Sequence, residues 1–111
     1  MRDEIIVEKM LQYAAKVHEY CKDISYDAFR ENNLLVEACV FNLSQLGELV
    51  KKLSEAFREA NRQIAWGDIY GLRNRIVHDY EGINLRLIWE IVSDDIPKLQ
   101  QELSEIRKRH K

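Results

Sequence analysis

Apolar residues recur along this chain at steps of three and four, a spacing that places them on one face of an α-helix. The first such stripe extends from Asp3 to Asp23 and consists of Ile6, Met10, Tyr13, Val17, Tyr20 and Ile24. The second consists of Leu35, Cys39, Leu43, Leu46, Val50 and Leu53. We therefore predict two long amphipathic helices, separated by a short turn that Ser25 caps and by a break at Asn32 and Asn33.

The second half of the chain predicts two further helices. After a short turn that Ser54 caps and a connector from Asn61 to Ala65, the third helix is expected to begin at Trp66. Its inward stripe is Trp66, Ile69, Leu72 (or Arg73), Ile76 and Val77. It should end near His78 to Tyr80, because Gly82 supplies the glycine that is typical just past a helix end.

The last predicted helix begins after a cap at Asn84 and crosses the single proline of the chain. Its apolar positions are Leu85, Ile88, Trp89, Val92, Ile96, Leu99, Leu103 and Ile106. Because their phase continues across Pro97, we predict one kinked helix rather than two helices joined by a loop. The chain, residues 1–111, is thus predicted to be a single all-α domain, an up-and-down bundle of four main helices plus short turns.

The composition fits a compact helical protein, with 46% hydrophobic and 32% charged residues. The net charge is −2, so the total charge does not require a nucleic acid partner. Local positive charge does occur, at Arg73, Arg75 and His78 and in the closing residues 107–111. Since neither a leader segment nor an apolar run of the ~20 residues that span a bilayer is present, we expect a cytoplasmic protein without membrane contact.

Single residues within the predicted helices bear on packing. Cys21 and Cys39 lack the spacing of a metal site and are expected to be buried, reduced thiols. Asn42 lies near the second stripe, where a buried amide must be hydrogen-bonded. It is therefore either a bridge between helices, which we favour, or a polar wall of an active cavity. Gly47, a glycine inside a helix, indicates close packing by another helix.

Residues 71–80, called the candidate segment below, concentrate polar chemistry in a short stretch. On a helix Asn74 and His78 lie one above the other, while Arg73 and Tyr80 lie on a neighbouring face. His78 has an ordinary pKa near neutrality, so it can give or take a proton at cellular pH. Arg73 offers a planar, permanently charged fork that suits phosphate oxygens.

Together these side chains match what RNA cleavage without a metal requires. His78 would act as the base for the ribose 2′-hydroxyl, which is itself the nucleophile, and Arg73 would stabilise the charge that builds up on the phosphorus. Asn74 would orient the imidazole or hold a substrate oxygen. No cofactor and no metal ion are expected.

The spacing of Arg73 and His78 poses a geometric difficulty. They are five residues apart, roughly 140° around an ideal helix, and so do not face the same point. Either the helix end unwinds, or two chains pair and each lends part of one site. Gly67 and Gly71 leave room for another backbone or a phosphate chain to come close, and we favour the homodimer.

Other polar and aromatic residues are expected to have ordinary roles. His18 and His110 have no evident partner and are read as solvated or packing residues. Trp66 and Trp89 are expected to be core anchors rather than platforms for base stacking. The basic residues 107–111 fit a helix end, where positive charge is favourable, although contact with RNA stays open.

The pattern of Arg73, four residues, His78, one residue and Tyr80 resembles the signature of the HEPN superfamily. The likeness is to the HepT-like toxins, which are encoded beside a minimal nucleotidyltransferase antitoxin of the MntA type. Further segments that resemble this family are Gly47-Glu48, Lys52-Leu53-Ser54, Trp66, Trp89, Asp95-Ile96-Pro97 and Leu99. Ala65 departs from the pattern, because many members have proline before the tryptophan, and this affects the entry into the third helix.

The resemblance implies a helical homodimer with a ribonuclease site shared between its two motif helices. Arg73 and His78 would be catalytic, with Asn74 as the polar residue after the arginine. It also implies a type VII-like toxin–antitoxin pair in which the antitoxin transfers AMP from ATP to Tyr80. A nucleotide there would add negative charge and bulk beside Arg73, where a phosphate would otherwise bind.

Two other functions remain open on the sequence. The chain could be a non-catalytic partner or substrate-presenting subunit of the nucleotidyltransferase, which the exposed position expected for Tyr80 and the modest net charge favour. It could also be a structural bundle in which the candidate segment is only a dimer contact. Cleavage of RNA by the purified protein would distinguish the ribonuclease from both of these alternatives.

Overall fold

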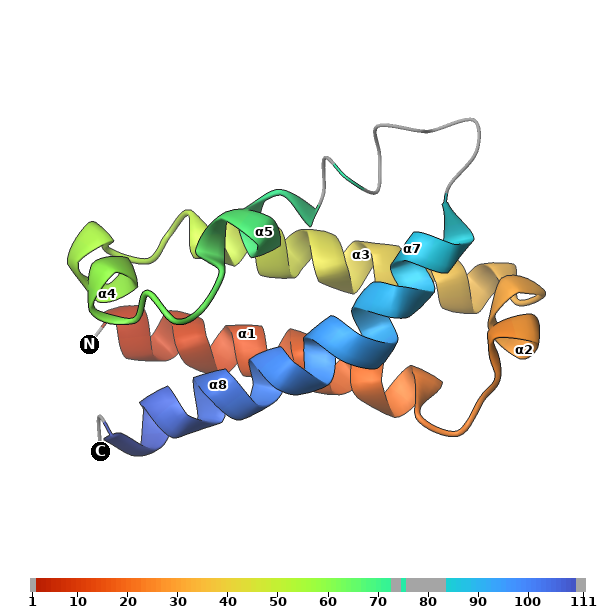
Figure 1. Cartoon of the computed structure of the whole chain (residues 1–111), viewed down its shortest axis with the longest axis horizontal. Coiled ribbons are helices and arrows are strands. Elements are labelled where there is room, and N and C mark those ends of the chain that lie inside the picture. Colours follow the sequence, from red (N-terminus) through yellow and green to blue (C-terminus); the bar gives the residue numbers. More distant parts are fainter. Residues whose placement is uncertain (1, 73–74, 76–83, 110–111) are drawn as a thin grey trace.

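The protein is described here by a computed structural model that covers residues 2–72, 75 and 84–109. Within these ranges it consists of helices and loops, and no β-strand occurs. Helix α1 (Arg2–Cys21) runs along the long axis, and α3 (Asn33–Val50) returns antiparallel beside it. A third long helical stretch, from Leu85 to Arg109, packs against α1 and brings the C-terminal end back beside the N-terminal one (Figure 1). The predicted all-α class is confirmed.

Short helices connect the long ones, and local caps fix where four of the helices begin. The connecting helices are α2 (Tyr26–Arg30), α4 (Glu55–Ala60) and α5 (Trp66–Tyr70), and α7 (Leu85–Glu90) begins the third long helical stretch. The side chains of Ser25, Asn32, Ser54 and Asn84 each accept a hydrogen bond of 3.0–3.1 Å from the backbone N–H three residues further on. The predicted starts of α2, α3, α4 and α7 are therefore confirmed.

The buried face of α1 differs from the predicted stripe. Ile6, Met10 and Val17 are buried as expected, but Tyr20 is 43% exposed. The remaining buried positions are Val7, Ala14 and Cys21. Helix α1 contacts both α3 and α8. Its buried face therefore includes its own small residues Ala14 and Cys21, which let both neighbours approach closely. Tyrosine, with an apolar ring and a polar tip, is compatible with either face.

The helix that crosses Pro97 contains a π-helical turn, η1 (Ile91–Asp95), between α7 and α8 (Ile96–Arg109). At its end the N–H of Ile96 donates to the carbonyl oxygen of Ile91, five residues back. A proline ring clashes with the carbonyl four residues before it, and the wider turn avoids this contact. The predicted helix across Pro97 is thus continuous, but it holds one extra residue in this turn.

The third predicted helix is described only in part. It begins at Trp66, as expected, with Trp66, Ile69 and Leu72 buried along its inward stripe. Its predicted end near residues 78–80 lies outside the described residues. The count of four main helices and the homodimer accordingly stay predictions. Across the described ranges, no helix is both long enough and apolar enough to cross a membrane.

Candidate active site

Helix α5 leads the chain into the candidate segment. Arg73, Asn74, His78 and Tyr80 lie outside the described residues, so their predicted roles stay predictions. Of the candidate segment, the structure describes residues 71–72 and 75. Leu72 is buried, and the N–H of Arg75 donates to the carbonyl oxygen of Gly71 at 2.9 Å while the Arg75 side chain is exposed.

Trp66 fixes the start of α5. Its indole N–H donates to the carbonyl oxygens of Arg58 and Asn61, both at 3.1 Å, and its ring packs against Phe57 with 6.2 Å between centroids. The preceding residue, Ala65, makes no side-chain cap. The tryptophan therefore ties α5 to the end of α4, and it serves as the core anchor that the sequence predicts.

Asn61 is a buried polar connection that the sequence analysis missed. It is only 3% exposed, and its amide nitrogen donates to the carbonyl oxygen of Phe57 at 2.9 Å. Its amide oxygen accepts from the guanidinium of Arg109 at 3.3 Å. One side chain thus joins α4 to the last turn of α8, and part of the basic C-terminal end has a structural role. An asparagine at the start of the predicted connector was the only indication in the sequence.

At Gly47 the backbones of α3 and α5 lie close together. A Cβ atom added there would lie 3.0 Å from the carbonyl oxygen of Ile69 and 3.3 Å from that of Tyr70. This confirms the predicted close packing. Nothing lies within 4 Å of a Cβ at Gly67, and one at Gly71 meets only carbonyl oxygens of α5 itself. Among these three glycines, Gly47 is therefore the one that packs tightly against the backbone of another helix.

We expect Gly47→Ala to destabilise the protein by about 1–3 kcal/mol, because the new methyl group must push α5 away from α3. Thermal unfolding followed by circular dichroism measures this, with Gly67→Ala as the matched control. The control is expected to be neutral or stabilising by about 0.5 kcal/mol, since alanine favours helix and meets no neighbour there. Equal melting temperatures for the two variants would contradict the tight contact.

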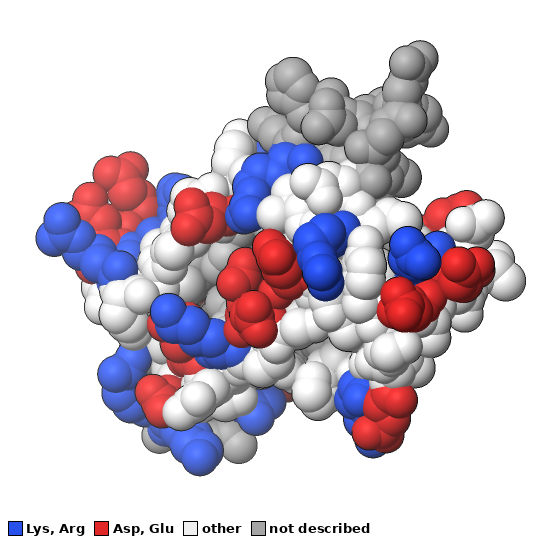
Figure 2. All heavy atoms as spheres, turned by 45° about the vertical axis from the view of Figure 1, so that its right-hand side comes forward, with Lys and Arg blue, Asp and Glu red and all other residues white. Residues whose placement is uncertain are grey.

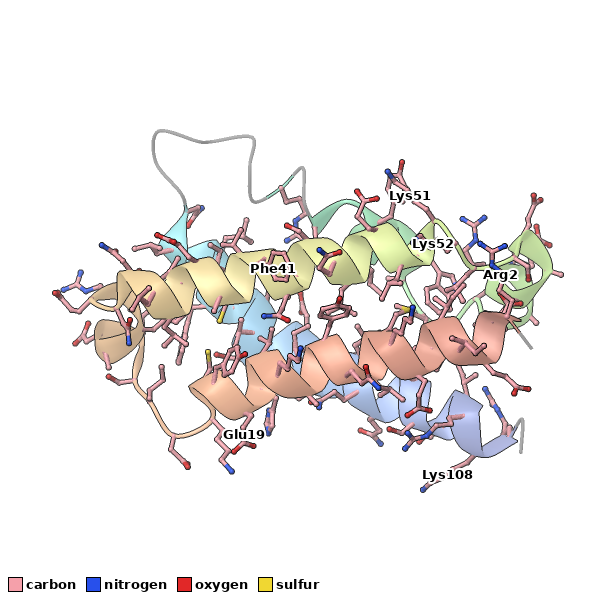
Figure 3. The ribbon with its side chains drawn as sticks, turned by 180° about the vertical axis from the view of Figure 1, so that it is seen from behind. Arg2, Glu19, Phe41, Lys51, Lys52 and Lys108 are labelled. Atoms are coloured by element: carbon pink, nitrogen blue, oxygen red, sulfur yellow. The ribbon has the colours of Figure 1, made fainter. Side chains whose placement is uncertain are left out.

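A cation–π contact adds a second connection between α3 and α5. The ammonium of Lys51 lies 5.1 Å from the ring centroid of Tyr70, whose side chain is 46% exposed. Figure 3 shows Lys51 projecting outward at the C-terminal end of α3. The same view shows Phe41, 58% exposed, on the outer surface of that helix. An exposed cation–π contact such as that of Lys51 with Tyr70 contributes about 0.5–1 kcal/mol.

A cavity of about 170 Å³ lies between the α5 region and the η1–α8 helix, and Leu72 and Arg75 of the candidate segment help to line it. Its apolar wall consists of Ile64, Ile69, Leu72, Ile91, Ile96 and Leu99. Its charged members are Asp68, Arg75, Asp95, Lys98 and Glu102. Three carboxylates beside two cations do not favour a phosphate chain. On the face shown in Figure 2, the described Lys and Arg side chains are likewise interspersed with Asp and Glu side chains.

The remaining predictions within the core have mixed outcomes. Asn42 is buried, but its amide nitrogen donates to the carbonyl oxygen of Ala38 at 2.7 Å, in its own helix rather than to a neighbouring one. The ring of Trp89 packs against that of Phe29 at 5.2 Å between centroids and is a packing residue, as predicted. His18 is exposed, as expected. Among the described residues no cluster of His, Cys, Asp and Glu side chains has the arrangement of a metal site.

Comparison with known proteins identifies the family. Residues 10–106 match the family described as "Ribonuclease HepT-like". "Putative RNase TTE0752" of Caldanaerobacter subterraneus subsp. tengcongensis is 36% identical over 95% of this chain and 94% of its own length. "Putative RNase MJ1380" of Methanocaldococcus jannaschii is 36% identical over 85% and 86%. "Probable ribonuclease HepT" of Thermococcus cleftensis is 24% identical over 92% and 93%.

No solved structure matches the chain. The family match covers most of the sequence and includes all of the candidate segment. The chain therefore belongs to the HepT-like ribonuclease family, and the resemblance drawn from its motif is confirmed.

Proposed function

We propose that this protein is the toxin of a type VII-like toxin–antitoxin pair and acts as a metal-independent endoribonuclease. The observation that carries the proposal is the family match over residues 10–106, which contains the arginine, histidine and tyrosine of the candidate segment. We propose a cytoplasmic location, because both the RNA substrate and the ATP that supplies the modifying group occur there.

The proposed reaction uses the side chains of the candidate segment and the RNA itself. His78 removes the proton from a ribose 2′-hydroxyl, whose oxygen attacks the adjacent phosphorus. The bond to the 5′-oxygen breaks and that oxygen takes up the proton that His78 removed, which leaves a cyclic phosphate on one fragment and a 5′-hydroxyl on the other. Arg73 stabilises the negative charge on the phosphorus oxygens, and Asn74 orients the imidazole or a substrate oxygen.

A homodimer completes the proposed site, with Arg73 of one copy acting beside His78 of the other. The reason is the angle of roughly 140° between positions five residues apart on a helix. In a two-fold symmetric pair the same contact occurs twice, so each dimer would hold two equivalent sites.

RNA cleavage in a metal chelator tests the proposal. Purified protein is incubated with single-stranded RNA in EDTA, beside the same sequence with every 2′-hydroxyl methylated. We expect cleavage of the unmodified RNA alone, because only it carries the nucleophile. Cleavage of both substrates would contradict the 2′-hydroxyl mechanism, and intact RNA in both would contradict the nuclease.

We expect Tyr80→Phe to prevent AMP transfer while leaving RNA cleavage intact. The tyrosine oxygen attacks the α-phosphorus of ATP and pyrophosphate leaves, so a phenylalanine has no acceptor atom. Mass measurement after co-expression with the partner nucleotidyltransferase gives the result. Tyr70→Phe is the matched control, since Tyr70 is exposed near the end of α5 and should leave AMP transfer unchanged. An AMP adduct on the Tyr80→Phe protein would place the acceptor elsewhere.

A second candidate function is a non-catalytic subunit that presents Tyr80 to the nucleotidyltransferase. The net charge of −2 and the mixed charges of the cavity beside α5 favour it over an RNA-binding protein. Under this alternative the purified protein accepts AMP on Tyr80 but leaves RNA intact at every concentration tested.

A further inference from the structure

The two cysteines of the chain lie in contact in the core, although 18 residues separate them in the sequence. Cys21 is the last residue of α1, and Cys39 lies in α3. Their sulfur atoms are 3.5 Å apart, and both thiols are free. A movement of about 1.5 Å would bring the sulfurs to bonding distance. The contact joins two of the long helices at one point.

One of the two thiols borders a cavity and the other does not. A cavity of about 230 Å³ is lined by Cys21, together with His18, Lys22, Ile24, Trp89, Val92, Ser93 and Pro97. Cys39 is fully buried, whereas Cys21 is 6% exposed. The exposed side chains of His18 and Lys22 mark the solvent side of this cavity. A small reagent can therefore reach Cys21 before Cys39.

The hydrogen bond between the thiols also makes Cys21 the more acidic of the two. It lowers the pKa of Cys21, against the opposing effect of burial, because the Cys39 thiol donates to the Cys21 thiolate. The same hydrogen bond, burial and the neighbouring negative charge raise the pKa of Cys39 above its ordinary value. The thiolate, which is the reactive form, thus belongs to Cys21.

We propose that Cys21 and Cys39 are a site of reversible oxidation, at which hydrogen peroxide converts the pair to an intramolecular disulfide. The Cys21 thiolate attacks one peroxide oxygen, which forms a sulfenic acid and releases hydroxide. The Cys39 sulfur then attacks the Cys21 sulfur, forming the S–S bond, and the hydroxyl group leaves as water with the Cys39 proton. Overall two thiols lose two electrons and two protons, and the peroxide becomes two waters.

The disulfide would clamp the end of α1 to α3 and enclose α2 in a closed loop. This inference is independent of the ribonuclease proposal, because it concerns residues outside the candidate segment and needs no RNA. Closing such a loop restricts the unfolded chain, so the oxidised protein is expected to melt about 10 °C higher than the reduced one. A thiol reductant should reverse the shift.

Treatment of the 111-residue chain with hydrogen peroxide tests the site. Free thiols are expected to fall from two per chain to none, with the chain monomeric by denaturing, non-reducing electrophoresis. Mass spectrometry should show the loss of two hydrogen atoms and a Cys21–Cys39 linked peptide. Persistence of both thiols, or disulfides between chains, would overturn the proposal.

Two single variants test the order of reaction. In the Cys39→Ser variant, hydrogen peroxide should convert Cys21 to a sulfenic acid that dimedone traps. The trapping rate should be about equal to the rate at which the native chain loses its thiols. Cys21→Ser should leave a Cys39 thiol that reacts with peroxide at least tenfold more slowly than Cys21 does, because Cys39 is fully buried and does not line the cavity. Equal rates would overturn the role of Cys21 as the first site. If either variant does not fold, the thiol count of the native chain still decides whether the disulfide forms.

Discussion

Replacing His78 with alanine is expected to slow RNA cleavage by about 10²–10⁴-fold while the melting temperature stays close to that of the native protein. General acid–base catalysis by a positioned side chain contributes a factor of this size. The measurement is the initial rate of cleavage of a labelled RNA in EDTA. His18→Ala is the matched control, since His18 is an exposed histidine of α1 and should leave the rate unchanged. Full activity of His78→Ala would end the proposed mechanism.

The same variant also tests whether the site is shared between two chains. In a mixture of Arg73→Ala and His78→Ala chains, a dimer containing one of each has one site with both native residues and one with neither. Half of the dimers are then mixed, and activity should recover to about a quarter of the native value. If Arg73 and His78 act within one chain, every site in the mixture lacks one of them and the mixture stays inactive.

The second large effect is expected at Trp66. Trp66→Ala should lower the free energy of unfolding by about 3–5 kcal/mol, because it removes a large buried ring and leaves a cavity between α4 and α5. Denaturant titration measures the change. RNA cleavage should fall with it, since α5 leads directly into the candidate segment. A loss below about 1 kcal/mol would contradict the anchoring role.

Trp66→Phe separates packing from hydrogen bonding at the same position. Phenylalanine retains a ring against Phe57 but has no N–H, so the carbonyl oxygens of Arg58 and Asn61 lose their donor. We expect this variant to lose about 1–3 kcal/mol, less than Trp66→Ala. If both variants lose the same amount, the two hydrogen bonds rather than the ring hold α5 in place.

The sequence predicted those features of the fold that depend on nearby residues. The caps predicted at Ser25, Ser54 and Asn84 and the break predicted at Asn32 are local, because each of these side chains accepts a hydrogen bond from a backbone N–H only three residues away. The close packing at Gly47 was predictable for a related reason, since a glycine inside a long helix needs a steric explanation.

The features that depend on how helices meet were not predictable in the same way. The contact of Cys21 with Cys39 requires the register of α1 against α3, which no spacing within either helix records. The burial of Cys21 in place of Tyr20 depends on α1 having two neighbours. The π-helical turn at Ile91–Asp95 adds a residue without breaking the apolar phase, so periodicity could not detect it.

For the candidate site, the motif predicted the family, and the comparisons confirm it. The roles of Arg73, Asn74, His78 and Tyr80 stay predictions, since they concern residues that the structure does not describe. What the structure adds is the support around them: the anchor at Trp66, the tight crossing at Gly47 and the cavity beside Leu72. Sequence spacing predicted the first two of these and gave no sign of the third.

The first turns of α1 and the last turns of α8 lie side by side, where Arg107 pairs with Glu8 at 2.9 Å, and Figure 1 shows both described ends of the chain at the same end of the bundle. A folded segment whose two ends lie side by side tolerates circular permutation. A short peptide could therefore bridge residues 2 and 109 while new ends are opened at the loop between α1 and α2. Such a rearranged gene would keep every helix and would move any attached label to the opposite end of the molecule.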